Sequence, residues 1–112
     1  FAYVSPPANG SSETVTIKNG DDFNFSWKKD SDSDVTSVTD VELFLMNDKN
    51  ATWLGVIWND GIKFSGDSAS AKVKVAVPSG TSLPNTFKFR SWANTAKGPN
   101  CIAFSVDFKI TQ

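Results

Sequence analysis

The sequence predicts an all-β fold, a single antiparallel β-sandwich of about seven or eight strands. Apolar and polar residues alternate with a period of two along most of the 112 residues, and clusters of Gly, Asn, Asp and Pro separate the alternating runs. No segment shows the longer periodicity of an amphipathic helix. Parallel neighbouring strands need a long crossover, usually a helix, so antiparallel pairing is expected.

The first half of the chain contains four expected strands, at 1–4, 13–18, 23–27 and 39–46. In ETVTIK (13–18) two apolar side chains alternate with threonine and lysine, and an Asn-Gly-Asp turn follows. In FNFSW (23–27) three aromatic side chains share one face, and the last of them, Trp27, suits the centre of a sandwich. The strand at 39–46 has an inward apolar face and an outward face that also carries Phe and Met.

The second half contains four more expected strands, at 52–58, 71–77, 86–92 and 103–110. Each is bounded by turn residues, and a Pro-Ser-Gly sequence ends the strand at 71–77 because proline cannot donate into a β-ladder. The side chains expected to face inward are Val15, Ile17, Phe23, Phe25, Trp27, Val41, Leu43, Leu45, Leu54, Val56, Trp58, Ala71, Val73, Val75, Val77, Phe87, Phe89, Phe104, Val106, Phe108 and Ile110. Such a set gives one core, so we expect one immunoglobulin-like or fibronectin-III-like domain covering 1–112.

The KKDSDSD stretch at 28–34 raises the question of a metal site. Its aspartates Asp30, Asp32 and Asp34 follow the spacing of a calcium loop, but positions six and twelve, which should be Gly and Glu, are Val35 and Val41. We therefore interpret the stretch as a solvated turn, with weak calcium binding as the alternative, and expect neither a metal site nor a cofactor.

Composition excludes several function classes. The formal net charge is −1 and the pI is about 5.2, so there is no basic field for nucleic acid or an anionic membrane surface. Histidine is absent, which removes the commonest general base and metal ligand, and no convincing nucleophile motif is present. The sequence therefore predicts a protein that is not an enzyme, with an accessory domain of a larger glycan-active protein as the nearest alternative.

Cysteine usage and N-glycosylation sequons indicate the compartment. The single Cys101 allows no intrachain disulfide; it is expected to be a small, partly buried residue, or a thiol that cross-links two copies. Three Asn-x-Ser/Thr sequons at Asn9, Asn24 and Asn50 fall at expected turns or outward strand positions. No membrane-spanning run is present, and the start at Phe1 fits a secreted product whose leader has been removed. We expect a secreted, glycosylated protein.

Four passages carry a family resemblance: SPPANGSSETVTIKNGDDFNFSW (5–27), VELFLMND (41–48), VAVPSGTSLPNTFKFRSW (75–92) and AFSVDFKI (103–110). Their order resembles the immunoglobulin-like domain at the N-terminus of yeast cell-wall proteins needed for β-1,6-glucan synthesis. Fungal Ser/Thr-rich GPI-anchored surface proteins share this domain. The resemblance implies a secreted or wall-associated fungal protein with no catalytic residue to carry over. A Ser/Thr-rich stalk and a hydrophobic C-terminal tail are missing from these residues, so lipid anchoring is not expected of them.

Aromatic residues on the outward faces are the candidate ligand-binding residues. Trp53 and Trp92 have the parity opposite to their strands' main apolar faces, and Lys88 and Arg90 share the face of Trp92. Tyr3 is a further outward candidate. Exposed tryptophan stacks on sugar rings, while lysine and arginine donate hydrogen bonds to hydroxyls. The alternative for these side chains is ordinary packing or a contact between subunits.

Two functions remain in view. The first is a wall protein that binds a cell-wall glycan, a β-glucan, or contributes to wall organisation. The alternative is a secreted fungal immunomodulatory or lectin-like protein that uses the same face to contact a surface receptor or to form a homodimer.

Overall fold

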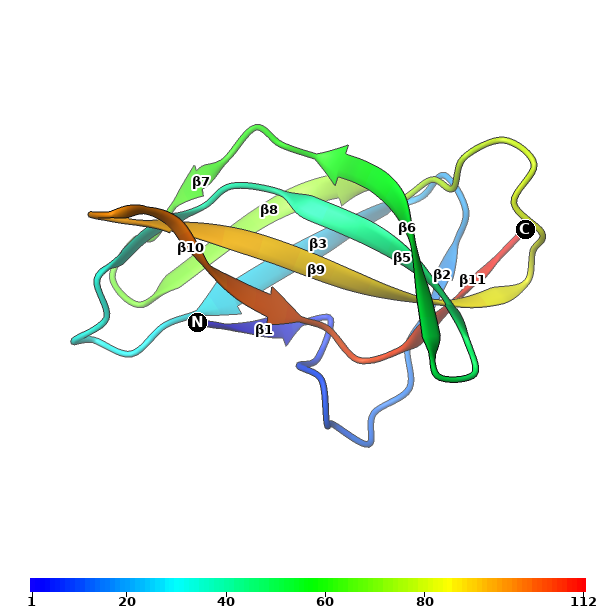
Figure 1. Cartoon of the computed structure of the whole chain (residues 1–112), viewed down its shortest axis with the longest axis horizontal. Coiled ribbons are helices and arrows are strands. Elements are labelled where there is room, and N and C mark those ends of the chain that lie inside the picture. Colours follow the sequence, from blue (N-terminus) through cyan, green and yellow to red (C-terminus); the bar gives the residue numbers. More distant parts are fainter.

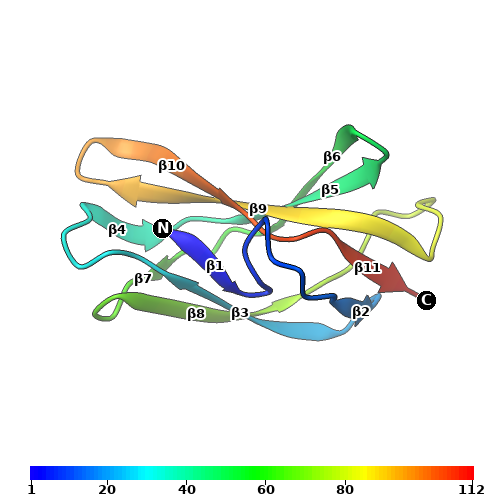
Figure 2. The ribbon, with the colours of Figure 1, turned by 90° about the horizontal axis from the view of Figure 1, so that it is seen from below.

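The computed structural model describes residues 1–112, with the side chains of all of them except Pro99 and Asn100. The described chain contains strands and turns and no helix, arranged in two layers (Figures 1 and 2). No segment that it describes is a helix able to cross a membrane. The strands are β1 (Ala2–Ser5), β2 (Thr16–Lys18), β3 (Asp22–Lys28), β4 (Val35–Val38), β5 (Val41–Asn47), β6 (Asn50–Trp58), β7 (Ile62–Lys63), β8 (Ser68–Lys74), β9 (Asn85–Thr95), β10 (Gly98–Phe104) and β11 (Phe108–Thr111).

The predicted all-β sandwich is confirmed, with eleven strands because one predicted segment, 103–110, is divided and the two short strands β4 and β7 are added. The smaller sheet has the order β1-β3-β8. In the larger sheet the eleven-residue β9 is central: β11 and β10 pair with it, and so do β5 and β4, while β6 extends the sheet beyond β5. Pairing is antiparallel except between β2 and β11, which run parallel, so the expectation of purely antiparallel pairing was wrong at this one position.

The core lies between the two sheets and is mainly aromatic. Trp27 is fully buried and stacks on Trp58, with 6.1 Å between ring centroids. Phe25 meets Phe89 edge to face at 4.8 Å, and Phe89 stacks on Phe108 at 4.2 Å. These contacts join β3 of the small sheet to β9 and β11 of the large one. Since Phe25, Trp27 and Phe89 come from strands whose apolar residues alternate, the period-two pattern brings these layers together.

Tyr3 was predicted to face outward and lies instead in the core, with 2% of its surface exposed. The short β1 pairs with β3 so that Tyr3 is opposite Trp27, and both rings therefore point toward the other sheet. Its hydroxyl makes a buried hydrogen bond of 2.5 Å with Ser91 Oγ. Burial raises the pKa of Tyr3 far above its usual value. Tyr3 is thus a structural residue that links β1 to β9.

Two further inward assignments were wrong, both at irregular strands. In β6 the register with β5 shifts on either side of the predicted inward residue Val56, which is 47% exposed, while Ile57 packs against the core. The predicted strand 103–110 is interrupted between β10 and β11. Phe104 therefore shares a face with its pairing partner Arg90, and the buried residues of this region are its neighbours in sequence. An extra residue in one strand reverses the parity of everything beyond it.

The acidic stretch forms a turn, as expected. Asp30, Asp32 and Asp34 lie in the connection between β3 and β4 and are exposed. The backbone N–H of Ser33 donates to the carbonyl of Asp30 at 3.0 Å, which closes the turn.

Candidate functional site

The large sheet has an outward side that combines aromatic and charged residues, and we call it the outer face. Figure 2 shows β10 and the β5–β6 hairpin rising to either side of β9, so that the face is curved. The residues of this face are Glu42, Phe44, Trp53, Lys88, Arg90, Trp92, Asn94, Ile102 and Phe104. It contains four of the five predicted ligand-binding residues; Tyr3 is the exception.

A buried ion pair lies at the centre of the outer face. Glu42 and Arg90 are directly opposite each other on β5 and β9, and a guanidinium nitrogen of Arg90 contacts Glu42 Oε2. The side chains are 6% and 25% exposed respectively. The indole N–H of Trp53 donates to the same carboxylate oxygen at 3.0 Å. Such charge-assisted hydrogen bonds hold both donors in defined positions.

The same guanidinium lies against two aromatic rings. Its central carbon is 4.8 Å from the ring centroid of Phe44 and 5.7 Å from that of Trp92. Cation–π contacts of this kind contribute about 0.5–2 kcal/mol each, depending on how dry the site is. Arg90 therefore positions Phe44 and Trp92, while Glu42 positions Trp53. Of the three rings, Trp53 is the most open to solvent, at 55% exposed.

Glu42 is a residue of the candidate site that sequence reasoning missed. Its parity places it outward between the core residues Val41 and Leu43, which suggests an ordinary exposed acid. The pairing of β5 with β9 brings it to Arg90, and the pairing of β5 with β6 brings the indole N–H of Trp53 within hydrogen-bond distance of it. The sequence did contain one indication of a binding face, because Phe44, an aromatic residue, shares the outward side of the same strand with Glu42.

A hollow of about 430 Å³ lies beside the ion pair. It is lined by Thr39 and Asp40, from the connection between β4 and β5, and by Trp92 and Asn94 of β9; we call it the Trp92 hollow. Asp40 Oδ1 accepts from the backbone N–H of Trp92 at 3.1 Å, and the Thr39 hydroxyl donates to the Trp92 carbonyl at 3.1 Å. Burial raises the pKa of Asp40, and the neighbouring Glu42 raises it further.

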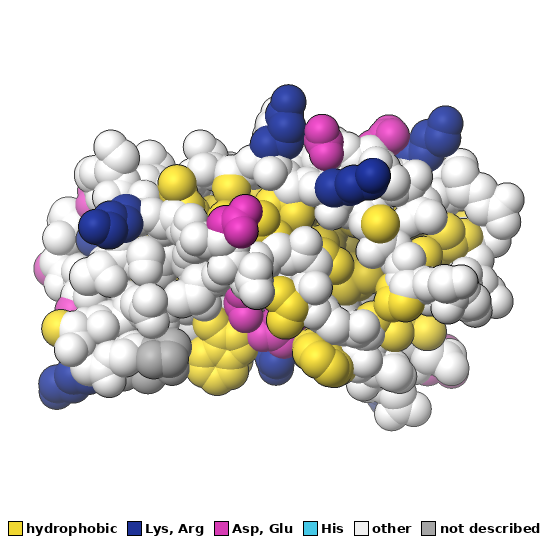
Figure 3. Space-filling view, turned by 90° about the horizontal axis from the view of Figure 1, so that it is seen from above, with side chains coloured by type: hydrophobic (Ala, Val, Ile, Leu, Met, Phe, Trp, Pro, Cys, Tyr) yellow, Lys and Arg dark blue, Asp and Glu magenta, His cyan; other side chains and the backbone are white. Residues whose placement is uncertain are grey.

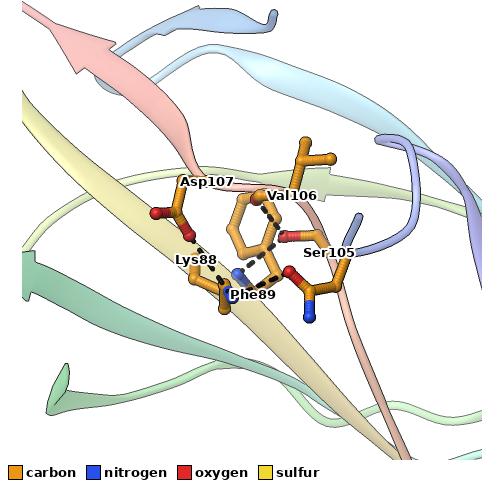
Figure 4. A network of polar contacts seen from close by, with 6 residues as sticks. Lys88, Phe89, Ser105, Val106 and Asp107 are labelled. Atoms are coloured by element: carbon orange, nitrogen blue, oxygen red, sulfur yellow. Dashed lines mark hydrogen bonds and ion pairs between the residues drawn. The ribbon is translucent and has the colours of Figure 1, made fainter. Parts of the chain in front are cut away.

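Lys88 was predicted to contact a ligand, and its ammonium group already has protein partners. It donates to Asn9 Oδ1 at 3.1 Å and lies 3.4 Å from Asp107 Oδ1 (Figure 4). In the same close-up, Ser105 Oγ accepts from the N–H of Phe89 and donates to the carbonyl of Val106. These bonds secure the break between β10 and β11. Lys88 thus has a structural role at the edge of the outer face, and its charge is balanced.

The three sequons and Cys101 lie where the sequence suggested. Asn9 and Asn50 are exposed in turns or at a strand start, and Asn24 is exposed on the outward side of β3 in the small sheet. Their glycosylation remains a prediction. Cys101 is partly buried within β10, which begins earlier than predicted.

A second hollow, of about 380 Å³, opens at the side of the sandwich. It lies between β6 and the chain that follows β8, and side chains of Leu54, Val56, Val77 and Pro78 contribute to its lining. Figure 3 shows a band of hydrophobic side chains on this side, with Lys or Arg side chains around it. Apart from Lys74, the lining side chains have no hydrogen-bonding groups, so this hollow offers little to a hydroxylated ligand.

Comparisons with known proteins place the chain in a family. No curated protein matches its sequence. Among solved structures, one similar chain is described as the 1.4 Å resolution crystal structure of an uncharacterized protein from Bacillus anthracis str. Ames. Its sequence identity is 16%, its TM-score is 0.40, and the match covers 97% of this chain and 89% of the other.

The family models identify the domain. The model described as the Kre9/KNH-like N-terminal Ig-like domain matches residues 7–110, almost the whole chain. The fold agrees with it, because two packed sheets surround one aromatic core. This family is related to the fungal cell wall and to glucan synthesis, and its members are associated with secreted and cell-wall proteins. The chain therefore belongs to the Kre9/KNH-like N-terminal Ig-like domain family.

Proposed function

We propose that this domain binds a neutral cell-wall polysaccharide, a β-glucan, through its outer face, and that it does so without chemical conversion of the glycan. The observation that carries the proposal is the group of rings around one ion pair: Phe44, Trp53 and Trp92 are held by Glu42 and Arg90 on a single face. Rings held in place lose little conformational freedom on binding, which favours stacking on a sugar. The family's link to wall glucan indicates the class of ligand.

The dimensions and charges of the outer face suit a short stretch of neutral glycan. From Trp53 on β6 across β5 and β9 to Phe104 on β10 there are three strand spacings of about 4.8 Å, or roughly 14 Å. Arg90 is paired with Glu42, and Lys88 is paired with Asp107. No unpaired cation of this face is therefore available, among the residues described, to attract an anionic polysaccharide.

The arrangement of the carboxyl groups supports binding rather than hydrolysis. Glycosidases use two carboxyl groups at least about 5 Å apart, with the bond to be cleaved between them. Here Asp40 and Glu42 are neighbours, and Glu42 raises the pKa of Asp40. Glu42 is also buried and engaged by Arg90 and Trp53, so it has no access to a substrate.

Retention on insoluble β-glucan tests the proposal. Trp53→Ala should weaken binding by about tenfold or more, equivalent to roughly 1.4 kcal/mol, because the most exposed stacking ring is lost. Val4→Ala is the matched control, since Val4 is 51% exposed and lies on β1 of the other sheet. Wild-type protein that is not retained, or a Trp53→Ala variant that binds as the wild type does, would contradict the proposal.

A second candidate function is contact with a protein, either a surface receptor or a second copy of the chain. The observation that favours it is β6, which pairs with β5 alone among the strands that the structure describes, carries no charged side chain, and exposes both Trp53 and Val56. Uncharged edge strands are prone to pair with another chain. Light scattering over a concentration series should then detect a dimer that Val56→Lys disrupts; a monomer at every concentration would remove the homodimer version.

A further inference from the structure

We infer that the Trp92 hollow is a subsite for one neutral hexopyranose ring and that the Asp40 carboxyl group makes it reject anionic sugars. The inference rests on the proposed function and adds to it the place where one sugar residue is recognised and the basis for selecting it. The hollow's volume of about 430 Å³ lies within the range typical of small-ligand sites, about 300–1,000 Å³.

The hydrogen bonds already made in the hollow determine what it offers a ligand. The Thr39 hydroxyl donates its hydrogen to the Trp92 carbonyl, so its oxygen can only accept a hydrogen bond from a ligand. Asp40 uses one carboxylate oxygen for the N–H of Trp92 and retains the other. One Asn94 side-chain N–H donates to Ser37 Oγ at 3.4 Å, which leaves the amide oxygen able to accept and the second N–H able to donate.

Three acceptors beside an aromatic ring match the chemistry of a neutral sugar. Sugar hydroxyls are donors, so each can supply the proton that Thr39, Asp40 or Asn94 requires. The ring of Trp92 contributes an apolar surface for the C–H face of the pyranose. This combination of a few convergent polar groups with an aromatic side chain is typical of small-ligand sites.

The same acceptors disfavour a carboxylate or phosphate group. Such a group has no proton to give at neutral pH, so it would be desolvated against oxygen atoms. The surroundings add to this effect, because the Asp40 carboxyl group lines the hollow and has a second carboxyl group, that of Glu42, as its neighbour. Arg90 is already engaged by Glu42 and does not compensate for an incoming anion.

Two sugars that differ in one group test the inference. Methyl β-D-glucopyranoside and its uronate, which carries a carboxylate in place of the primary alcohol, are titrated into isotopically labelled wild-type protein and followed by NMR. The glucoside should shift the Trp92 indole and Asn94 side-chain amide signals in a saturable manner. The uronate should bind at least about tenfold more weakly, equivalent to roughly 1.4 kcal/mol.

Asp40→Asn is the informative variant. Asparagine keeps an oxygen that accepts from the Trp92 N–H, so the connection between β4 and β5 should fold normally. It removes the negative charge and adds an N–H donor, so the tenfold preference for the glucoside over the uronate should fall to about threefold or less. Asp32→Asn serves as the matched control, because it makes the same change of charge at an exposed position of the turn between β3 and β4, outside the hollow, and should leave this preference unchanged.

The outcomes separate this inference from the proposed function. If glucan retains the wild type but the glucoside leaves the Trp92 and Asn94 signals unshifted, the subsite inference is refuted. The proposal that the outer face binds glucan is then unaffected. Equal affinity for the two sugars, or an unchanged preference in Asp40→Asn, overturns the selection by charge. If glucan does not retain the wild type while the glucoside binds in the hollow, the proposal of β-glucan binding is refuted. The inference that the Trp92 hollow binds one sugar ring is then supported.

Discussion

Substituting Glu42 by Gln tests whether the buried ion pair organises the outer face. The variant keeps the shape of the side chain and an oxygen for the Trp53 indole, but Arg90 loses its countercharge. Arg90 Nε is already buried without a hydrogen-bond partner, and in the variant the partly buried Asp40 remains as an acidic neighbour of the guanidinium. Loss of one partner from a fully buried pair costs about 3–5 kcal/mol, whereas an exposed pair contributes about 0–1 kcal/mol.

The exposure of the two side chains places this pair between those limits. Glu42 is almost completely buried at 6%, while Arg90 retains 25% contact with solvent that screens its charge. We therefore expect Glu42→Gln to lower the free energy of unfolding by about 2–3 kcal/mol. Urea denaturation followed by tryptophan fluorescence measures it, with an unchanged slope against denaturant showing that the variant reaches the same folded state.

A double variant separates the loss of a charge partner from general damage. Glu42→Leu combined with Arg90→Met replaces the pair by apolar side chains, and should cost less than the sum of the single variants by at least about 1 kcal/mol. A loss below about 1 kcal/mol in Glu42→Gln would show that the pair behaves as a surface salt bridge. Additive effects in the double variant would show that the two side chains do not act together.

Two titrations give the remaining predictions. Burial raises the pKa of Tyr3, so stability should fall as pH rises above about 10, where the unfolded chain loses the phenolic proton and the folded chain keeps it. Tyr3 is the only tyrosine, so tyrosinate absorbance should appear together with unfolding; ionisation while the fold persists would refute this, and Tyr3→Phe should lack the alkaline loss. Burial also raises the pKa of Asp40, so its contribution is present below about pH 4 and lost as pH rises through the raised pKa. The stability of Asp40→Asn relative to the wild type should therefore increase with pH above about 4, and a difference independent of pH would contradict the assignment.

The sequence by itself determined the fold class and most of the side-chain directions. Alternation in β3 and β9 predicts that Trp27 and Phe89 face the core while Arg90 and Trp92 face outward, and the structure confirms this. Such assignments succeed because side-chain direction in a regular strand depends only on local parity. The outward position of Trp53 follows from the same rule.

Tertiary structure decided the positions that depend on register. The bulges in β6 and the break before β11 reverse the parity at Val56 and Phe104, and a period-two pattern contains no sign of an inserted residue. Tyr3 is inward because β1 is aligned with β3, which its four residues alone do not specify. The pairing of Glu42 with Arg90 joins residues 48 positions apart in sequence. Which residues meet across strands depends on the free energy of the whole packed sheet, and therefore on contacts that no local pattern encodes.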